Sequence, residues 1–241
     1  MNIVEKLNRK QDMHSSPPVT IAFIGDSITQ GCFEVYYKTQ TQLDTVYEYK
    51  NAFPTRVGEI LSLLYPNVQV NIINSGISGD TVCRGLDRLE RDVIRYSPDL
   101  VVVGYGANDC NLGGKDGVKA YTDGLRDMFE RIQACGAEVI YLTEGPFCTK
   151  VSPFVTDERL VPLAEKFSDL ENQGILGSYF AAGKHTAEES GVKCCDTYSA
   201  WKALERGGVD ITELLANKLN HPSRDMHYYI AVKLIETIFD I

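Results

Sequence analysis

The stretch VTIAFIGDSITQG, residues 19–31, joins an apolar run to a polar turn and gives the clearest indication of the fold. Residues 19–24 are apolar and rich in β-branched side chains, which is typical of a strand buried on both faces of a sheet. Comparable runs recur at residues 68–73, 100–103, 139–143 and 192–195. We expect each of these five runs to be a strand of one sheet.

Apolar residues at helical spacing fill most intervals between the expected strands. Five stripes follow this rule: Phe53, Val57, Ile60, Leu61 and Leu64; Val82, Leu86, Leu89 and Val93; Val118, Tyr121, Leu125, Phe129 and Ile132; Leu160, Leu163, Phe167 and Leu170; and Ile230, Leu234 and Ile238. Strands that alternate with helices predict a mainly parallel sheet, because a parallel crossover needs about a dozen residues or more. The sequence therefore predicts a three-layer α/β/α sandwich with five strands, in which ligands bind beyond the carboxyl ends of the strands.

The length and composition of the chain favour one domain. Its 241 residues are 44% hydrophobic, which is enough to bury a core without disulfides or metal ions. The chain has no internal repeat, low-complexity tract or Pro/Gly-rich linker at which two domains would meet. We expect a single domain over residues 1–241, with a polar leader at 1–17 and an aromatic-rich insertion at 32–51.

Charge and cysteine usage restrict the partners and the compartment. The formal net charge of −9 disfavours binding to nucleic acid or to anionic lipid. The seven cysteines are scattered and never spaced as a Cys-x-x-Cys knuckle, which indicates reduced thiols and no metal site. Residues 1–16 lack the apolar segment of a signal peptide, and no stretch approaches the ~18 apolar residues of a membrane span. We expect a cytoplasmic protein without nucleic-acid or membrane partners, and no pattern indicates its oligomeric state.

The turn after the first expected strand presents a candidate nucleophile. Gly25 lets the chain turn sharply, and the polar residues that follow it can expose the hydroxyl of Ser27. A second interpretation is that Asp26 or Ser27 caps the next helix, which is a common role for both residue types. The segment alone does not decide between a nucleophile and a cap.

Two later turns carry candidate hydrogen-bond donors. Gly79 follows the second expected strand, and its backbone N–H could face a negatively charged oxygen. Asn108 follows the third strand, and its neutral amide can stabilise developing negative charge. An ordinary strand-to-helix turn is the better explanation for the Gly79 segment taken alone, and the Asn108 segment alone is ambiguous, because asparagine is also a common turn residue.

The loop before the last helix contains a candidate general base, His221, followed by Pro222. Pro222 fixes the entry into the helix, and an imidazole with a pKa near neutrality suits proton transfer. The other histidines have less favourable contexts, because they lie in the leader, in a charged stretch and inside the last helix: His14, His185 and His227.

Together, in chain order, the four segments resemble the SGNH, or GDSL, hydrolase family of esterases and acylhydrolases. The resemblance runs from residue 19 to about residue 231 and rests on Gly25-Asp26-Ser27, Asn108-Asp109 and His221-Pro222. It implies the flavodoxin-like fold of that family. It also implies that Ser27 is the nucleophile, that Ser27, Gly79 and Asn108 form the oxyanion hole, and that His221 is the general base.

One position departs from the family pattern. The family usually has an aspartate three residues before the histidine, but this chain has Lys218, whose side chain cannot accept a hydrogen bond from imidazole. We therefore predict a Ser27–His221 dyad. The imidazole would be oriented by a main-chain carbonyl near Lys218 or by a carboxylate, of which Asp225 and Glu213 are the nearest in sequence.

These residues predict a serine esterase that transfers an acyl group from a small ester to water without a metal or an organic cofactor. An acyltransferase would use the same dyad with another acceptor, and a binding protein of the same fold would not need the dyad. A nucleotide-binding module is disfavoured, because the chain lacks a Gly-x-x-x-x-Gly-Lys loop and a complete dinucleotide fingerprint.

The substrate is less well defined. Five aromatic side chains in the insertion could form one wall of the pocket and suit sugar rings or short acyl chains, although a packed loop or subunit contact explains them slightly better: Phe33, Tyr36, Tyr37, Tyr47 and Tyr49. No extended apolar loop is available for a long lipid chain. Cys110, close to Asn108, is interpreted as a small packing residue and not as a thiol nucleophile.

Overall fold

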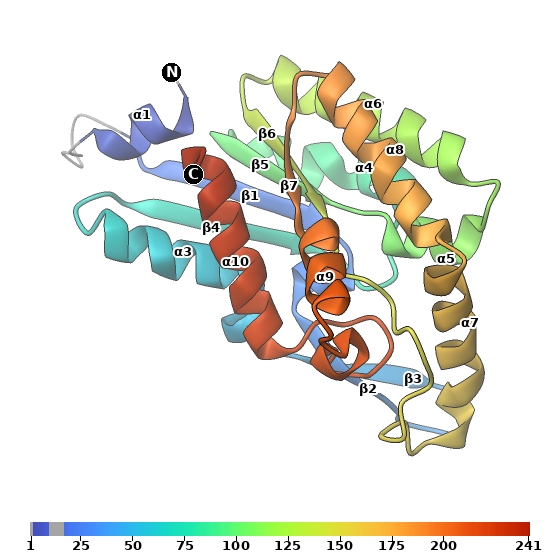
Figure 1. The fold of residues 1–241 in the computed structure, drawn as a ribbon. Coiled ribbons are helices and arrows are strands. Elements are labelled where there is room, and N and C mark those ends of the chain that lie inside the picture. The colour runs from blue at the N-terminus through green and yellow to red at the C-terminus, as the bar shows by residue number, and fades with distance from the viewer. Residues whose placement is uncertain (1, 10–16) are drawn as a thin grey trace.

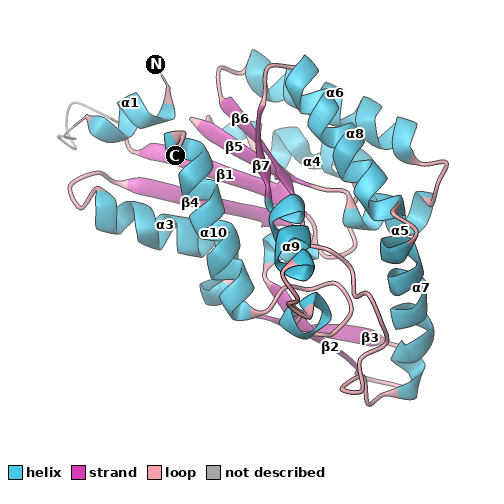
Figure 2. Cartoon of the chain, in the orientation of Figure 1, coloured by secondary structure: helices cyan, strands magenta, loops and turns pink. Residues whose placement is uncertain are grey.

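The centre of the computed structural model, which describes residues 2–9 and 17–241, is a five-stranded sheet (Figures 1 and 2). Its strands are β1 Val19–Gly25, β4 Val70–Gly76, β5 Leu100–Gly104, β6 Glu138–Thr143 and β7 Lys193–Asp196. They lie in the order β4-β1-β5-β6-β7, and every neighbouring pair is parallel. This is the flavodoxin-like strand order. The predicted α/β fold with a five-stranded parallel sheet is confirmed.

Helices cover both faces of this sheet (Figure 1). On one face lie α1 Ile3–Asn8, α3 Phe53–Leu64 and α10 Arg224–Phe239, and on the other lie α4 Val82–Asp92, α6 Val118–Ala134 and α8 Ile175–Glu189. Strand β1 shows how the two cores are divided. Ile21 and Phe23 join the core under α3 and α10, whereas Ala22 and Ile24 join the opposite core, because side chains alternate along a strand.

The remaining helices lie near the carboxyl ends of the strands or at the edge of the sheet. They are α2 Ser27–Gln30, α5 Ala107–Gly113, α7 Val161–Asn172 and α9 Thr197–Arg206. The five apolar stripes correspond to α3, α4, α6, α7 and α10. Helices α8 and α9 have no counterpart among the expected elements, and β4 begins and ends later than the predicted strand at residues 68–73.

The aromatic-rich insertion forms a separate antiparallel hairpin of β2 Cys32–Tyr37 and β3 Leu43–Tyr47. The hairpin lies beyond the carboxyl end of the main sheet and next to α7 (Figure 1). It was not predicted as strands. Its position places the residues that follow Ser27 over the edge of the sheet where ligands bind in this class of fold.

The expected polar leader at residues 1–17 contains a folded element. Helix α1 buries Ile3 and Leu7 against the core that also contains α10. The rest of the leader, residues 1 and 10–16 with His14, lies outside the described residues. Among the helices at 2–9 and 17–241, none is both long enough and apolar enough to cross a bilayer.

Candidate active site

Ser27 is the first residue of α2, directly beyond the carboxyl end of β1. Of the two interpretations of this turn, the capping role belongs to Asp26. Asp26 is the cap of α2, and its Oδ1 accepts a hydrogen bond of 2.8 Å from the backbone N–H of Ile28. The hydroxyl of Ser27 is not used for capping and instead lies 3.0 Å from Nε2 of His221. Both side chains of this pair are about 95% buried.

The imidazole of His221 has a second partner on the other side of its ring. Its Nδ1 lies 2.8 Å from the backbone carbonyl oxygen of Phe33, in β2. A carbonyl can only accept a hydrogen bond, so Nδ1 must carry the proton and Nε2 must present its lone pair to Ser27. This is the tautomer that can accept a proton from the Ser27 hydroxyl.

Burial keeps the His221 imidazole uncharged. It lowers the pKa of His221 to about 4, although the hydrogen bond to Phe33 and the charge of Glu34 act in the opposite direction. The ring is therefore neutral at pH 7, and a neutral ring is the form that can act as a base. His227, one helical turn into α10, is also fully buried, and its Nδ1 accepts a hydrogen bond of 3.1 Å from the Phe53 N–H.

The groups expected to orient His221 do not contact it. The ammonium group of Lys218 bonds the backbone oxygen of Glu213 at 2.7 Å and its carboxylate at 3.1 Å, so these two residues satisfy each other. Asp225 is exposed on α10. A main-chain carbonyl does accept from Nδ1, but it belongs to Phe33 and not to a residue near Lys218. The choice among nearest neighbours in sequence was wrong, because the hairpin brings in a group 188 residues away.

Asn217, which the sequence interpretation did not single out, holds the His221 loop. Its side-chain oxygen accepts hydrogen bonds of 3.0 Å from the backbone N–H groups of Leu219, Asn220 and His221. Side chains of this type commonly fix turns in this way. Asn217 therefore sets the backbone position from which the imidazole reaches Ser27.

Gly79 and Asn108 flank the same hydroxyl. Both line the cavity that contains Ser27 and His221. Gly79 has a φ of +78°, which favours glycine, and its N–H makes no hydrogen bond within the described part of the chain. The amide nitrogen of Asn108 donates to Oδ2 of Asp26 at 2.8 Å, which fixes the orientation of the amide and leaves its second N–H for a ligand.

The cavity at Ser27 has a volume of about 210 Å³. Its apolar side is formed by the hairpin, by α7 and by the His221 loop: Val35, Leu43, Leu163, Phe167 and Leu219. Among the five aromatic residues of the insertion, Tyr47 lines the cavity. Phe33 instead packs against the ring of His227, with centroids 4.8 Å apart, so part of the insertion is a packed loop.

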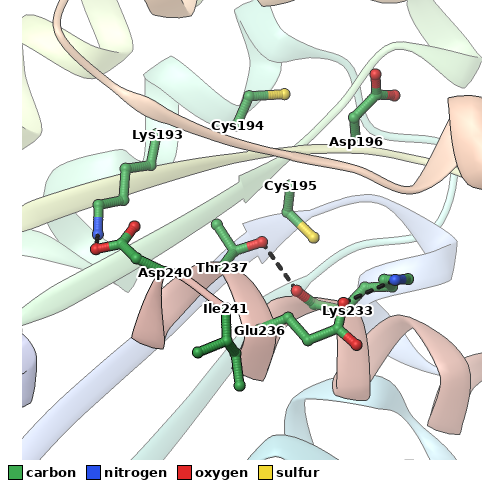
Figure 3. A pocket seen from close by; sticks show the side chains of 9 residues that line it. All are labelled: Lys193, Cys194, Cys195, Asp196, Lys233, Glu236, Thr237, Asp240 and Ile241. Carbon is green, nitrogen blue, oxygen red and sulfur yellow. Dashed lines mark hydrogen bonds and ion pairs between the residues drawn. The ribbon is translucent and has the colours of Figure 1, made fainter.

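The thiols of Cys110, Cys194 and Cys195 are not activated as nucleophiles. Burial raises the pKa of Cys110 to about 12, so its thiol stays protonated in the core. A second hollow, between β7 and α10, contains Cys194 and Cys195, whose pKa values are also raised, to about 12 and about 11 (Figure 3). The lysines of that hollow are paired with acidic side chains of α10 and its C-terminal end: Lys193 with Asp240, and Lys233 with Glu236. Residues 2–9 and 17–241 contain no cluster of three or more His, Cys, Asp or Glu side chains that could hold a metal ion.

Arg224 connects the hairpin to the start of α10. Its guanidinium bonds both carboxylate oxygens of Glu34, at 2.7 and 3.0 Å, and Oε2 of Glu48 at 2.9 Å. It also lies over the ring of Phe33, 4.5 Å from the centroid. Phe33 supplies the carbonyl that accepts from His221, and Arg224 follows His221 by three residues. These contacts therefore hold the hairpin beside the segment that carries the imidazole.

Replacing Arg224 with Met should lower kcat about tenfold, because small displacements of a base are costly to the rate. Partly exposed ion pairs contribute only about 0–1 kcal/mol to stability, so the melting temperature should change little. Steady-state kinetics and thermal melts check both expectations. Lys233→Met is the matched control, since it removes an ion pair from the same helix without touching the hairpin. Equal kcat values for the two variants would contradict the role of Arg224.

His221 should make the stability of the fold sensitive to acid. The unfolded chain binds a proton at His221 near pH 6.5, whereas the folded chain binds it only near pH 4, so protonation favours the unfolded state between these values. The stability advantage of the wild type over His221→Gln should shrink by up to about 1.4 kcal/mol per pH unit below pH 6.5. Urea unfolding of both proteins at pH 7, 6 and 5 measures this difference. A difference in the free energy of unfolding that stays constant with pH would contradict the lowered pKa of His221.

The fold and the polar groups beyond the carboxyl ends of its strands indicate a class of protein. An α/β protein with a serine hydroxyl against an oriented neutral imidazole, beyond the carboxyl ends of parallel strands, has the arrangement typical of serine hydrolases. A family model for the GDSL-like lipase/acylhydrolase family matches residues 23–228. The chain belongs to this family, and the predicted resemblance is confirmed.

Individual relatives agree with this assignment. An arylesterase of Vibrio mimicus is 38% identical over 81 residues, which are 34% of this chain and 40% of that protein. An acetylxylan esterase of Geobacillus stearothermophilus is 34% identical over 89 residues, which are 37% of this chain and 39% of the relative. The matches thus span about two fifths of each curated relative.

Solved structures share the fold over most of the chain. A crystal structure of an acetylxylan esterase from Geobacillus stearothermophilus superposes with a TM-score of 0.66 at 23% identity, and covers 91% of this chain and 94% of the other. A GDSL-like lipase structure from Parabacteroides merdae superposes with a TM-score of 0.66 at 20% identity, and covers 93% and 97%.

Proposed function

We propose that this protein is a serine esterase that hydrolyses small carboxylic esters, with short acyl chains and acetylated carbohydrate as its substrate class. One observation carries the proposal: the hydrogen-bonded series from Ser27 Oγ to His221 Nε2 and from His221 Nδ1 to the Phe33 carbonyl, at 3.0 and 2.8 Å. This series supplies a nucleophile, a base and an acceptor that fixes the tautomer of the base.

The reaction follows from these positions. His221 Nε2 takes the proton of Ser27 as Oγ attacks the ester carbonyl carbon. The tetrahedral oxyanion accepts hydrogen bonds from the N–H groups of Ser27 and Gly79 and from the Asn108 amide. His221 then protonates the leaving alcohol. Water repeats the sequence on the acyl-enzyme, releases the acid and restores the Ser27 hydroxyl.

The size and lining of the cavity support small substrates. Its volume of about 210 Å³ is below the ~300 Å³ at which pockets for drug-sized ligands begin. The apolar side suits a short acyl group. Polar side chains of the hairpin, of the Gly79 loop and of the His221 loop could meet hydroxyl groups of the alcohol part: Asp44, Thr45, Ser78 and Asn220. The names of two relatives, an arylesterase and an acetylxylan esterase, agree with ester hydrolysis.

A panel of esters tests this proposal. Nitrophenyl esters from acetyl to long-chain acyl groups, together with acetylated sugars, should show the highest kcat/KM for acetyl donors, and Ser27→Ala serves as the blank. Preference for long chains, or activity that persists in the blank, would overturn the proposal. The same panel with glucose as a competing acceptor separates hydrolysis from acyl transfer, because a transferase would form an acylated sugar in place of free acid.

We also propose a cytoplasmic location for this protein. It is supported by the seven cysteines, all of which carry free thiols in the structure.

A further inference from the structure

We propose that Glu144 shares one proton with Asp26 and thereby holds the Asn108 amide where it meets the oxyanion. Glu144 would then be a positioning residue of the site. The inference rests on the proposed function, and it assigns a role to a buried acid that the reaction itself does not use.

Glu144 lies directly after β6 and is 2% exposed. Its Oε2 accepts a hydrogen bond of 3.1 Å from the backbone N–H of Ala107, the residue before Asn108. Its carboxyl group is also in hydrogen-bond contact with the carboxyl group of Asp26. Asp26 in turn accepts the amide of Asn108 and the N–H of Ile28, both at 2.8 Å. Glu144 therefore supports Asn108 twice, through its backbone neighbour and through its side-chain partner.

The contact between the two carboxyl groups requires a proton. An ionised carboxylate only accepts hydrogen bonds, so two ionised groups would repel each other in a site without solvent. Oε1 of Glu144 has no donor among the residues that the structure describes. A proton on Glu144 turns the repulsive contact with Asp26 into a hydrogen bond. Asp26 already accepts two hydrogen bonds, from Ile28 and Asn108, which favour its ionised form, whereas Glu144 accepts one, from Ala107. Glu144 is therefore the member that carries the proton, and the raised pKa of Glu144, caused by its burial, agrees with this.

The surroundings help the pair to keep this proton. Two further buried acids, Asp80 and Asp109, face it and disfavour additional negative charge. Asp80 is partly compensated by Arg88, whose guanidinium lies 2.6 Å from its Oδ2. Burial raises the pKa of Asp109 to about 7. The other titratable groups that face the pair stay uncharged because their pKa values are raised by burial: Cys32, Tyr105, Tyr121 and Tyr141.

Loss of the shared proton should disturb catalysis. Two adjacent anions would separate, and Asp26 and Glu144 would pull the Asn108 amide and the Ala107 N–H away from their positions. The wild type should therefore lose kcat at alkaline pH. Glu144→Gln should not, because a glutamine oxygen can still accept from Ala107 while its amide donates to Asp26 at every pH.

The test compares kcat against pH for the wild type, Glu144→Gln and Glu144→Ala with the best substrate of the ester panel. At pH 7, Glu144→Gln should stay within about twofold of the wild type, because the glutamine keeps the hydrogen bonds to Ala107 and Asp26. The fall in kcat at alkaline pH should be absent from this variant. Glu144→Ala should lose up to about a hundredfold, as expected for a misplaced catalytic group. Glu171→Gln is the matched control: it removes another buried carboxyl, one paired with Lys202 at 3.0 Å, and its pH profile should follow the wild type.

A double-mutant cycle separates positioning from general stability. Once Asn108 is Ala, adding Glu144→Ala should cost less than about twofold, since Glu144 would act through the missing amide. If the two losses multiply, or if the profiles of wild type and Glu144→Gln superimpose, the inference is overturned. If Glu144→Ala does not fold, the pH dependence of kcat in the wild type and in Glu144→Gln still tests whether Glu144 and Asp26 share a proton. A failure of the proposed function would appear differently, as a wild type without Ser27-dependent ester hydrolysis.

Discussion

Ser27→Ala is expected to lower kcat about a millionfold while leaving the fold intact. In the proposed mechanism the hydroxyl accounts for the whole covalent pathway, and among residues 2–9 and 17–241 no other nucleophile with an activating base lines the cavity. His221→Ala should lose nearly as much, and the double variant should lose no more than either single one, because the two groups act as a unit. Steady-state hydrolysis of a nitrophenyl acetate measures all three.

Because Ser27 is small and His221 already lies in a loop, circular dichroism and thermal melts should show folded variants. Asp225→Asn is the control for the orienting group. Asp225 is exposed on α10, so this variant should hydrolyse esters like the wild type. A loss of a thousandfold or more in Asp225→Asn would contradict the assignment of the Phe33 carbonyl as the group that orients His221.

Asn108→Ala is expected to slow kcat by about a hundredfold to a thousandfold, equivalent to roughly 2.7–4 kcal/mol of barrier. The amide is held by Asp26 at 2.8 Å before substrate arrives, so in the proposed mechanism it would stabilise the oxyanion without reorganising. The loss should appear in kcat, with a small change in KM, because the oxyanion exists only in the transition state.

Asn111→Ala is the matched control for Asn108, since it removes an amide from the same helix, α5, that does not line the cavity. Its kcat should stay near that of the wild type. If Asn108→Ala instead raised KM and left kcat unchanged, Asn108 would bind the substrate and not the oxyanion.

The sequence predicted the fold because the pattern of buried strands and amphipathic helices is local. The central strands β1, β5 and β6 are buried, mainly apolar runs, whereas the edge strands β4 and β7 are only partly buried and contain polar residues. The order of the polar turns follows from parallel topology. Ser27 and His221 were predicted as a pair because their residue types carry chemistry, and the structure places their reacting atoms 3.0 Å apart.

The remaining parts of the site depend on tertiary contacts that have no local signal. The group at His221 Nδ1 is a backbone carbonyl, and every residue has one, so Phe33 could not be distinguished by its side chain. The hairpin that carries Phe33 was interpreted only as an aromatic insertion. Asn217 could have been considered from its residue type, since asparagine side chains commonly accept hydrogen bonds from backbone N–H groups in a turn.

Glu144 was missed for a related reason. A single acidic residue after a strand is ordinarily a solvated turn residue, and only the packing of β6 beside β5 buries it against Asp26 and Ala107. Burial in the tertiary fold, and not the residue type, decides that this acid is a structural support.

Labelling with a fluorophosphonate, followed by peptide mass spectrometry, tests the activation of Ser27 by His221 most directly. The wild type should incorporate one phosphonyl group, on Ser27, whereas His221→Ala should react only slowly and Asp225→Asn at the rate of the wild type. Rapid label on another residue, or equally fast label of Ser27 without His221, would contradict this mechanism.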